Sequence, residues 1–107
     1  MKLNEYQKKA AKAAFYEKDD VVYCALGITG EAGEVADHVK KMLRDDNGKL
    51  TKKRKEELEK ELGDVLWYVA KMAGRLDLTL EEVAKTNLNK IADRVARGKQ
   101  RGSGDNR

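Results

Sequence analysis

The chain has 107 residues, of which 40% are apolar and 39% are charged, and it contains no proline. A chain of this length fits one domain, and the lack of proline favours uninterrupted amphipathic helices over the many turns of a β-sandwich. The composition therefore predicts an all-α protein.

Charge and cysteine content restrict the setting in which the chain works. The formal net charge is +4, and lysine and arginine are concentrated at 40–60 and 85–107, which predicts an anionic partner. Cys24 is the single cysteine, so an intramolecular disulfide is excluded. The N-terminus has neither a long apolar run nor a cleavable signal pattern. We therefore expect a cytoplasmic protein that does not enter a membrane.

The first half of the chain predicts two helices. Asn4 and Gln7 have the spacing of a capping box and would open a helix over about 5–17, which the sequence EKDD then interrupts. A second helix is expected over about 21–44, where the turn-forming sequence RDDNGK ends it.

The second half predicts two more helices and a tail. A third helix is expected over about 53–76, and the capping box of Thr79 and Glu82 opens a fourth that ends near Gly98. Their inward stripes would be Leu58, Leu62, Val65, Val69, Met72 and Leu76, then Ala84, Leu88, Ile91 and Val95. Residues 1–98 are thus interpreted as one four-helix bundle-like domain, completed by oligomerisation, and residues 99–107 as a flexible or substrate-ordered tail.

A carboxylate pattern occurs twice, at an offset of 30 residues: EAGEVADHVKKM from Glu31 and ELGDVLWYVAKM from Glu61. Six of the twelve aligned positions are identical, and Glu34 aligns with Asp64. At about 100° per residue, both acids of each helix lie on the same flank of its apolar stripe. If the two stripes face one core, the four carboxylates converge at its rim.

Two interpretations of these acids remain open. Carboxylates at about 5 Å repel by roughly 3 kcal/mol per pair at an effective dielectric near 20, so either cations bind among them or they point into solvent beside the many lysines. Gly33 and Gly63 favour a binding site, because a helical glycine costs roughly 1 kcal/mol and indicates a close backbone approach or a bulky ligand. Oxygen ligands suit Mg²⁺ or Mn²⁺, and His38 is expected to be a packing residue at the rim.

The sequences GEAGEV and ELGDVLWY resemble the MazG-type nucleotide pyrophosphohydrolases, all-α enzymes whose signature is EExxE, a spacer and ExxD. Glu31, Glu34, Glu61 and Asp64 match four acids of that signature, and Gly30 stands where its first glutamate is usual. This departure bears on the number of metal ions held. The resemblance is nearest to the small MazG-like proteins of bacteria and phages.

The resemblance implies hydrolysis of ribo- or deoxynucleoside triphosphates to the monophosphate and pyrophosphate, with the four acids as metal ligands and catalytic residues. Asn87 and Lys90 match family positions that meet sugar and phosphates, and Arg94 is a weaker candidate, as are the tail residues 105–107. Two alternatives remain. One is a related pyrophosphohydrolase of phosphoribosyl-ATP or a modified nucleotide. The other is a non-catalytic basic helical module that binds nucleic acid or protein, although the basic segments lack interleaved aromatic residues.

On the third helix, with Glu61 placed at about 0°, the inward stripe lies between about 20° and 80°, and Trp67 lies at about 240°. It cannot share the core face of that stripe. A short chain that is apolar on two sides of a central helix is expected to associate, so we predict a homodimer or homotetramer. A base-stacking role and packing within the chain are the alternatives for Trp67.

Overall fold

A computed structural model describes residues 1–13 and 21–106 of the chain. These residues form four helices and no strand: α1 Leu3–Ala13, α2 Val21–Asp45, α3 Lys52–Arg75 and α4 Leu80–Ala96. The all-α prediction is confirmed, and α2 and α3 begin and end within one residue of the expected positions. The predicted interruption at EKDD lies outside the described residues, as does the expected end of the first helix. No described helix is both long enough and apolar enough to span a bilayer.

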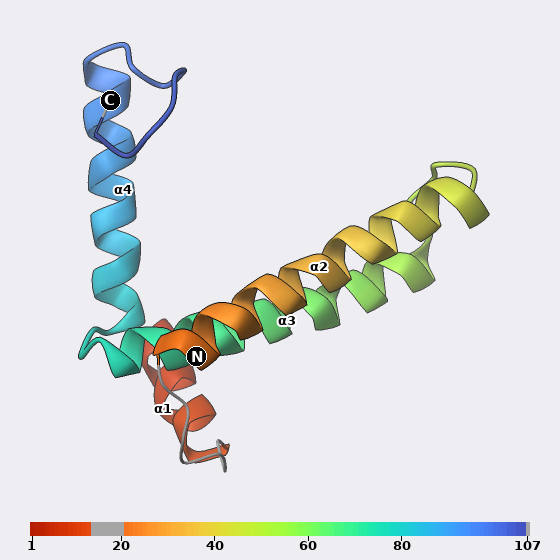
Figure 1. Ribbon diagram of the computed structural model, residues 1–107, viewed down its shortest axis with the longest axis horizontal. Helices are drawn as coiled ribbons and strands as arrows, with labels where there is room; N and C mark the ends of the chain where they lie inside the picture. The colour runs from red at the N-terminus through yellow and green to blue at the C-terminus, as the bar shows by residue number, and fades with distance from the viewer. Residues whose placement is uncertain (14–20, 107) are drawn as a thin grey trace.

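α2 and α3 lie side by side as an antiparallel pair joined by the short turn after Asp45 (Figure 1). Asn47 and Gly48 adopt positive φ angles of 55° and 72° in that turn, as the sequence RDDNGK predicted. Thr51 then caps α3, because its hydroxyl accepts a hydrogen bond from the Arg54 amide at 3.1 Å. The pair forms the long arm of the molecule.

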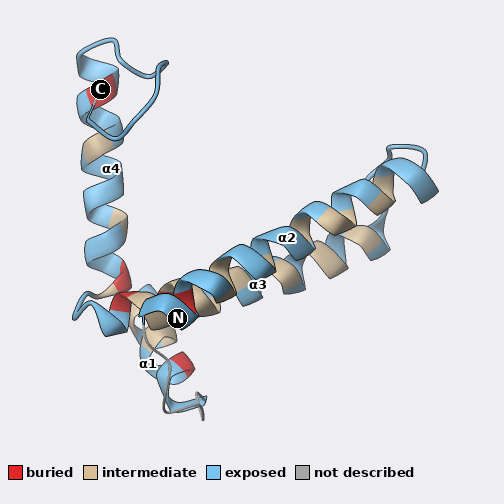
Figure 2. Cartoon of the chain, viewed as in Figure 1, coloured by how far each residue is buried: buried red, intermediate tan, exposed pale blue. Residues whose placement is uncertain are grey.

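The buried core lies where α1, α3 and α4 meet (Figure 2). Ala70 and Ala73 of α3 contact Leu80 of α4, and Tyr6 and Val69 pack around them. The small alanine side chains let the three helices approach closely. This junction fixes where α1 and the first turn of α4 sit relative to α3.

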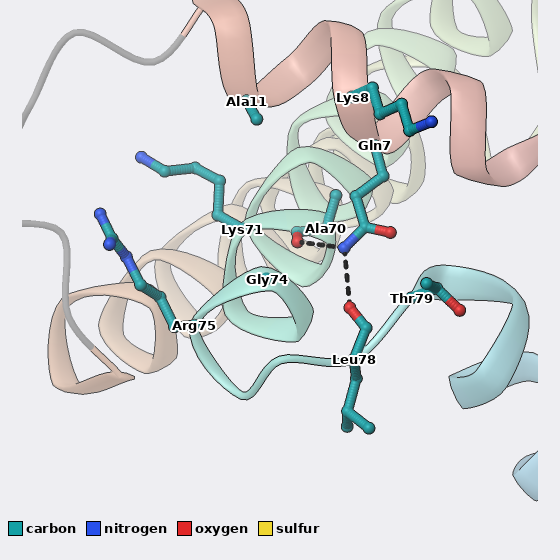
Figure 3. A pocket seen from close by; sticks show the side chains of 9 residues that line it. All are labelled: Gln7, Lys8, Ala11, Ala70, Lys71, Gly74, Arg75, Leu78 and Thr79. Carbon is teal, nitrogen blue, oxygen red and sulfur yellow. Dashed lines mark hydrogen bonds between the residues drawn. The ribbon is translucent and has the colours of Figure 1, made fainter.

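Gln7 connects the three helices at this junction (Figure 3). Its amide nitrogen donates to the carbonyls of Ala70 and Leu78 at 3.4 and 3.0 Å, and its amide oxygen accepts from the Leu80 amide at 2.9 Å. Beside it a hollow of about 450 Å³ opens between α1 and α3. The predicted capping box of Asn4 and Gln7 is therefore wrong: the helix begins at Leu3, and Asn4 instead bonds to Glu81 of α4.

The capping box at the start of α4 is confirmed. The Glu82 amide donates to the Thr79 hydroxyl at 3.1 Å, and the Thr79 amide donates to the Glu82 carboxylate at 3.0 Å. Both partners lie within one helical turn, so sequence spacing alone was sufficient to identify them.

α4 projects away from the α2–α3 pair, so the four helices do not close into a bundle within one chain (Figure 1). Leu88, Ile91 and Val95 remain 65%, 44% and 53% exposed, and Leu62 of α3 is 59% exposed. The prediction that the α4 stripe and all of the α3 stripe face an internal core is wrong for the single chain. The physical reason is that α4 contacts α1 and α3 and makes no contact with α2 along the described chain.

Candidate metal centre

Three carboxylates from the repeated pattern meet between α2 and α3. Glu31, Glu61 and Asp64 each offer one oxygen atom, and these atoms lie within 4.8 Å of one another. Glu61 and Asp64 are one turn apart on α3, so they share a helix face, and Glu31 reaches them from the neighbouring helix. Glu31 and Glu61 are half-buried and Asp64 is exposed, so the group is open to solvent on one side.

The electrostatics of this group is dominated by like charges. Burial raises the pKa of Glu31, and the nearby Asp64, Glu61 and Glu34 carboxylates raise it further. Among the described residues neither Glu31 nor Asp64 has a lysine or arginine ion-pair partner. The group therefore carries negative charge without compensation from lysine or arginine.

Glu34 lies outside the group of three. Its side chain is exposed on α2, one turn after Glu31, although its charge still contributes to the raised pKa of Glu31. The structure thus brings together three of the four acids expected to bind metal.

Two neighbours of the acids were not predicted from the sequence as part of the site. The imidazole of His38 lies half-buried between α2 and α3, with Nε2 3.2 Å from an oxygen of Glu61. Tyr6 of α1 lies close enough to Asp64 that the carboxylate raises the pKa of the phenol, second to burial. His38 follows Glu31 by two helical turns, a spacing that could have indicated its position. No sequence signal connects Tyr6 to Asp64, because tertiary packing alone brings α1 to this place.

Aromatic side chains gather near the same end of the α2–α3 pair. The ring of Tyr68 lies 6.3 Å from that of Tyr23 and 5.2 Å from that of Trp67, measured between centroids. The ammonium of Lys71 lies 4.2 Å from the centroid of Trp67. Burial raises the pKa of Tyr68, followed by its hydrogen bond to Tyr23 and the charge of Glu31.

The glycines beside the acids do not behave as expected. A Cβ atom at Gly30, Gly33 or Gly63 would meet nothing within 4 Å. The explanation of Gly33 and Gly63 by a close backbone approach is therefore wrong for the single chain. The close approach occurs instead at Gly27, where a Cβ atom would clash with the ring of Tyr68.

The predicted substrate-binding residues lie on α4, apart from the acids. Asn87 and Lys90 line one hollow of about 340 Å³. Arg94 is buried, and its Nη2 donates to the backbone carbonyls of Gly104 and Asp105 at 3.4 and 2.8 Å. The Asp105 carboxylate also lies 3.0 Å from Lys90 Nζ and 3.3 Å from Arg94 Nη2. The tail is thus folded back onto α4, and its Asp105 contacts two of the three predicted substrate-binding residues, Lys90 and Arg94.

α4 projects away from the α2–α3 pair that carries the acids (Figure 1). In the described part of the protein α4 contacts α3, the helix of Glu61 and Asp64, but makes no contact with α2, the helix of Glu31. The acid group itself fits a hard divalent cation. Its donors are all carboxylate oxygens, they converge from two helices, and one side is open for water or phosphate.

Comparison with known proteins agrees with the motif. The MazG nucleotide pyrophosphohydrolase domain matches residues 23–97, which include all four acids and the basic residues of α4. The chain is also 44% identical over 114 aligned positions to the Gene 37 protein of Mycobacterium phage L5, with both chains covered completely. No solved structure matches the chain. The repeated carboxylate pattern, the acid group between α2 and α3 and the domain match together show that the chain belongs to the MazG nucleotide pyrophosphohydrolase family.

Proposed function

We propose that the protein hydrolyses ribo- or deoxynucleoside triphosphates to the monophosphate and pyrophosphate, by attack of water at the α-phosphorus. The observation that carries this proposal is the convergence of Glu31, Glu61 and Asp64. Carboxylates within 4.8 Å repel by about 3 kcal/mol per pair at an effective dielectric near 20, less where water screens Asp64. A site that gathers such charges without lysine or arginine partners is suited to a cation.

The cation of this proposal is Mg²⁺, with Mn²⁺ as a substitute. Glu31, Glu61 and Asp64 would hold it, and Glu34 would complete the set by turning inward from its exposed position on α2. A bound divalent ion supplies positive charge that neutralises the phosphate chain and makes water a better nucleophile. The basic residues of α4 would hold the phosphates beside the acid group. Because water is the nucleophile, no side chain has to attack the substrate.

The substrate side of the proposal rests on α4. Asn87 and Lys90 line the same hollow, where an amide can hydrogen-bond a sugar hydroxyl and an ammonium can bind a phosphate. Arg94 would support phosphate binding from the next turn. Because the tail residue Asp105 contacts both Lys90 and Arg94, a phosphate group that reaches them must displace or rearrange that carboxylate.

The protein would act as a homodimer or a homotetramer. One stripe of α4 is apolar and exposed in the single chain: it consists of Leu88, Ile91 and Val95. Burial of these side chains against a second copy would stabilise the oligomer. A second copy that covers this stripe would also bring the basic residues of α4 toward acids that its own chain does not place beside them. The partner copy would therefore complete the site.

Subunit mixing tests this composite site. Each of the substitutions Asp64→Asn and Lys90→Gln should inactivate the enzyme on its own. The two inactive variants are then combined in equal amounts under conditions that exchange subunits. If the acids and Lys90 of one site come from different copies, mixed dimers contain one intact site, and random mixing restores about a quarter of the wild-type activity. Failure to recover activity, with exchange verified by mass, would place both halves of the site in one chain.

The function itself is tested by incubating the purified protein with each of the eight standard triphosphates in Mg²⁺ and in Mn²⁺. The products are separated and identified. Monophosphate and pyrophosphate in equal amounts, formed only with a divalent ion, would support the proposal. Orthophosphate and a nucleoside diphosphate would refute it, and salt-sensitive nucleic-acid binding without turnover would favour a binding module.

A further inference from the structure

His38 is held at both ring nitrogens beside the acid group. Its side chain is 16% exposed, in the interface between α2 and α3. Nε2 lies 3.2 Å from Oε1 of Glu61, and Nδ1 lies 3.2 Å from Nη1 of Arg54 and 3.2 Å from Oε2 of Glu57. Buried nitrogen atoms need polar partners, and here one of those partners is the Glu61 carboxylate of the acid group.

Arg54 is itself fixed in place. Its Nε donates to the Asp46 carboxylate at 3.1 Å, its Nη1 donates to the Glu57 carboxylate at 3.0 Å, and its side chain is only 13% exposed. The same Nη1 points at Nδ1 of His38. A chain of polar contacts therefore runs from the turn after α2, through Arg54 and His38, to Glu61.

These contacts determine where the imidazole carries a proton. A carboxylate oxygen can only accept, so Nε2, which faces Oε1 of Glu61, carries the ring proton of a neutral imidazole. Nδ1 is then unprotonated and accepts from the guanidinium of Arg54. In a charged imidazole, Nδ1 donates to Glu57 and Nε2 again carries a proton. In both cases Nε2–H donates a hydrogen bond to Oε1 of Glu61.

We propose that His38 is a positioning residue that holds the Glu61 carboxylate in the orientation needed to bind the cation. This inference rests on the proposed function, because it requires Glu61 to be a ligand. With one lone pair of Oε1 engaged by His38, the carboxylate cannot rotate freely, and one of its oxygen atoms stays within 4.8 Å of those offered by Glu31 and Asp64. Such supporting hydrogen bonds commonly change metal affinity by about 10- to 100-fold.

Two substitutions separate positioning from simple packing. His38→Gln keeps an N–H donor near the position of Nε2 and an oxygen that can accept from Arg54. His38→Leu fills much of the same volume but removes both polar functions. If His38 only packs, leucine is tolerated at least as well as glutamine.

The measurements are the Mn²⁺ dissociation constant from the electron paramagnetic resonance of free Mn²⁺, and kcat and KM with a nucleoside triphosphate. We expect His38→Leu to weaken Mn²⁺ binding by about tenfold or more and His38→Gln to stay within a few-fold of wild type. Equal Mn²⁺ affinity in His38→Leu and wild type would overturn the proposal, as would equal loss in both variants.

A measurement on the wild-type protein covers the case in which a variant does not fold. Long-range ¹H–¹⁵N correlation spectra of the imidazole should show a proton on Nε2, and this resonance should shift in Glu61→Gln. A neutral His38 with its proton on Nδ1 would overturn the proposal even if the enzyme is active. Wild-type protein that neither binds Mn²⁺ nor hydrolyses any nucleotide would overturn the proposed function and this inference together.

Discussion

The acid group between α2 and α3 and the basic residues Lys90 and Arg94 of α4 differ in whether the chain itself compensates their charge. Glu31, Glu61 and Asp64 crowd together without a lysine or arginine partner in the described chain. Lys90 and Arg94 already have an anion, because Asp105 of the tail binds both. The acid group is therefore suited to bind a cation from solution. Lys90 and Arg94, by contrast, must release or share the Asp105 carboxylate before they can bind a phosphate group.

This contrast ranks the two regions by how much a substitution should matter. A ligand carboxylate in an uncompensated group is required for the cation to bind at all. The exposed Asp105 contributes a salt bridge that solvent and salt weaken, so its removal should change binding only modestly.

The largest effect is expected from the acids. Asp64→Asn and Glu34→Gln should each lower pyrophosphate release by about 100-fold or more, because each keeps the shape of the side chain and removes a metal-binding charge. Glu59→Gln, at an exposed position of α3 outside the acid group, is the matched control and should retain activity. Near-normal turnover of Asp64→Asn at saturating Mg²⁺ would exclude that residue as a ligand, and the same test applies separately to Glu34.

A smaller loss is expected when the proposed oligomer is disturbed. Trp67→Glu should shift the protein toward monomer in light scattering and lower activity by about tenfold, because an aromatic anchor is replaced by a charge on the helix that carries Glu61 and Asp64. Lys55→Glu adds a carboxylate at an exposed polar position of the same helix and should leave the mass unchanged. An unchanged mass for Trp67→Glu would remove Trp67 from the interface and leave base stacking or intramolecular packing as its role.

Replacing an acid of the metal site should raise the stability of the metal-free protein although it lowers activity. The pKa of Glu31 is raised in the folded chain, so its effect on folding is favourable at low pH and is lost as the pH rises through that raised value. At neutral pH and in EDTA, Glu31→Gln should therefore raise the Tm by about 2 °C, and it should abolish the rise in Tm that Mg²⁺ gives the wild type. A lower Tm in EDTA would show that the charge of Glu31 is compensated in a way the structure does not contain.

The same shift predicts how metal binding depends on pH. Protons compete with the cation for Glu31, so Mg²⁺ affinity should begin to fall at a higher pH than for a carboxylate with its ordinary pKa. Titration of Mg²⁺ against Tm at several pH values measures this. An affinity that stays constant down to the ordinary carboxylate range would contradict the raised pKa.

The smallest effect is expected at the tail. Asp105→Asn removes the anion that Lys90 and Arg94 share, so KM for the nucleotide should fall by a factor of about 2 to 5 while kcat stays nearly constant. Asp93→Asn removes a different ion pair of α4, that with Arg97, and should leave KM unchanged. A higher KM for Asp105→Asn would mean that the tail helps to bind substrate and does not compete with it.

Features that depend on one helical turn could be predicted from the sequence. The Thr79 and Glu82 capping box needs partners three residues apart, and both hydrogen bonds form. The convergence of the acids also follows from helical geometry, once two amphipathic helices are joined by a short turn. The position of Glu34 did not follow, because it lies at the edge of the face and its side chain is free to point into solvent.

Features that depend on distant partners could not be predicted. Asn4 and Gln7 have the spacing of a capping box, but their side chains form hydrogen bonds with residues more than sixty positions away in the sequence. These tertiary hydrogen bonds take the place of the local ones. The apolar stripe of α4 was identified, but periodicity does not say whether a helix is covered by its own chain or by another. The contact of Arg94 with the tail was missed for a related reason, since no periodicity governs the path of residues 99–106.

Binding of Mn²⁺ to the protein, followed by the loss of the free-ion signal in electron paramagnetic resonance, tests most directly whether Glu31, Glu61 and Asp64 form a cation site. Wild-type protein should bind Mn²⁺ at least ten times more tightly than Asp64→Asn, and Mg²⁺ should compete. The control Glu59→Gln should match the wild type. Equal binding by wild type and Asp64→Asn would show that the acid group does not hold the ion and would contradict the account.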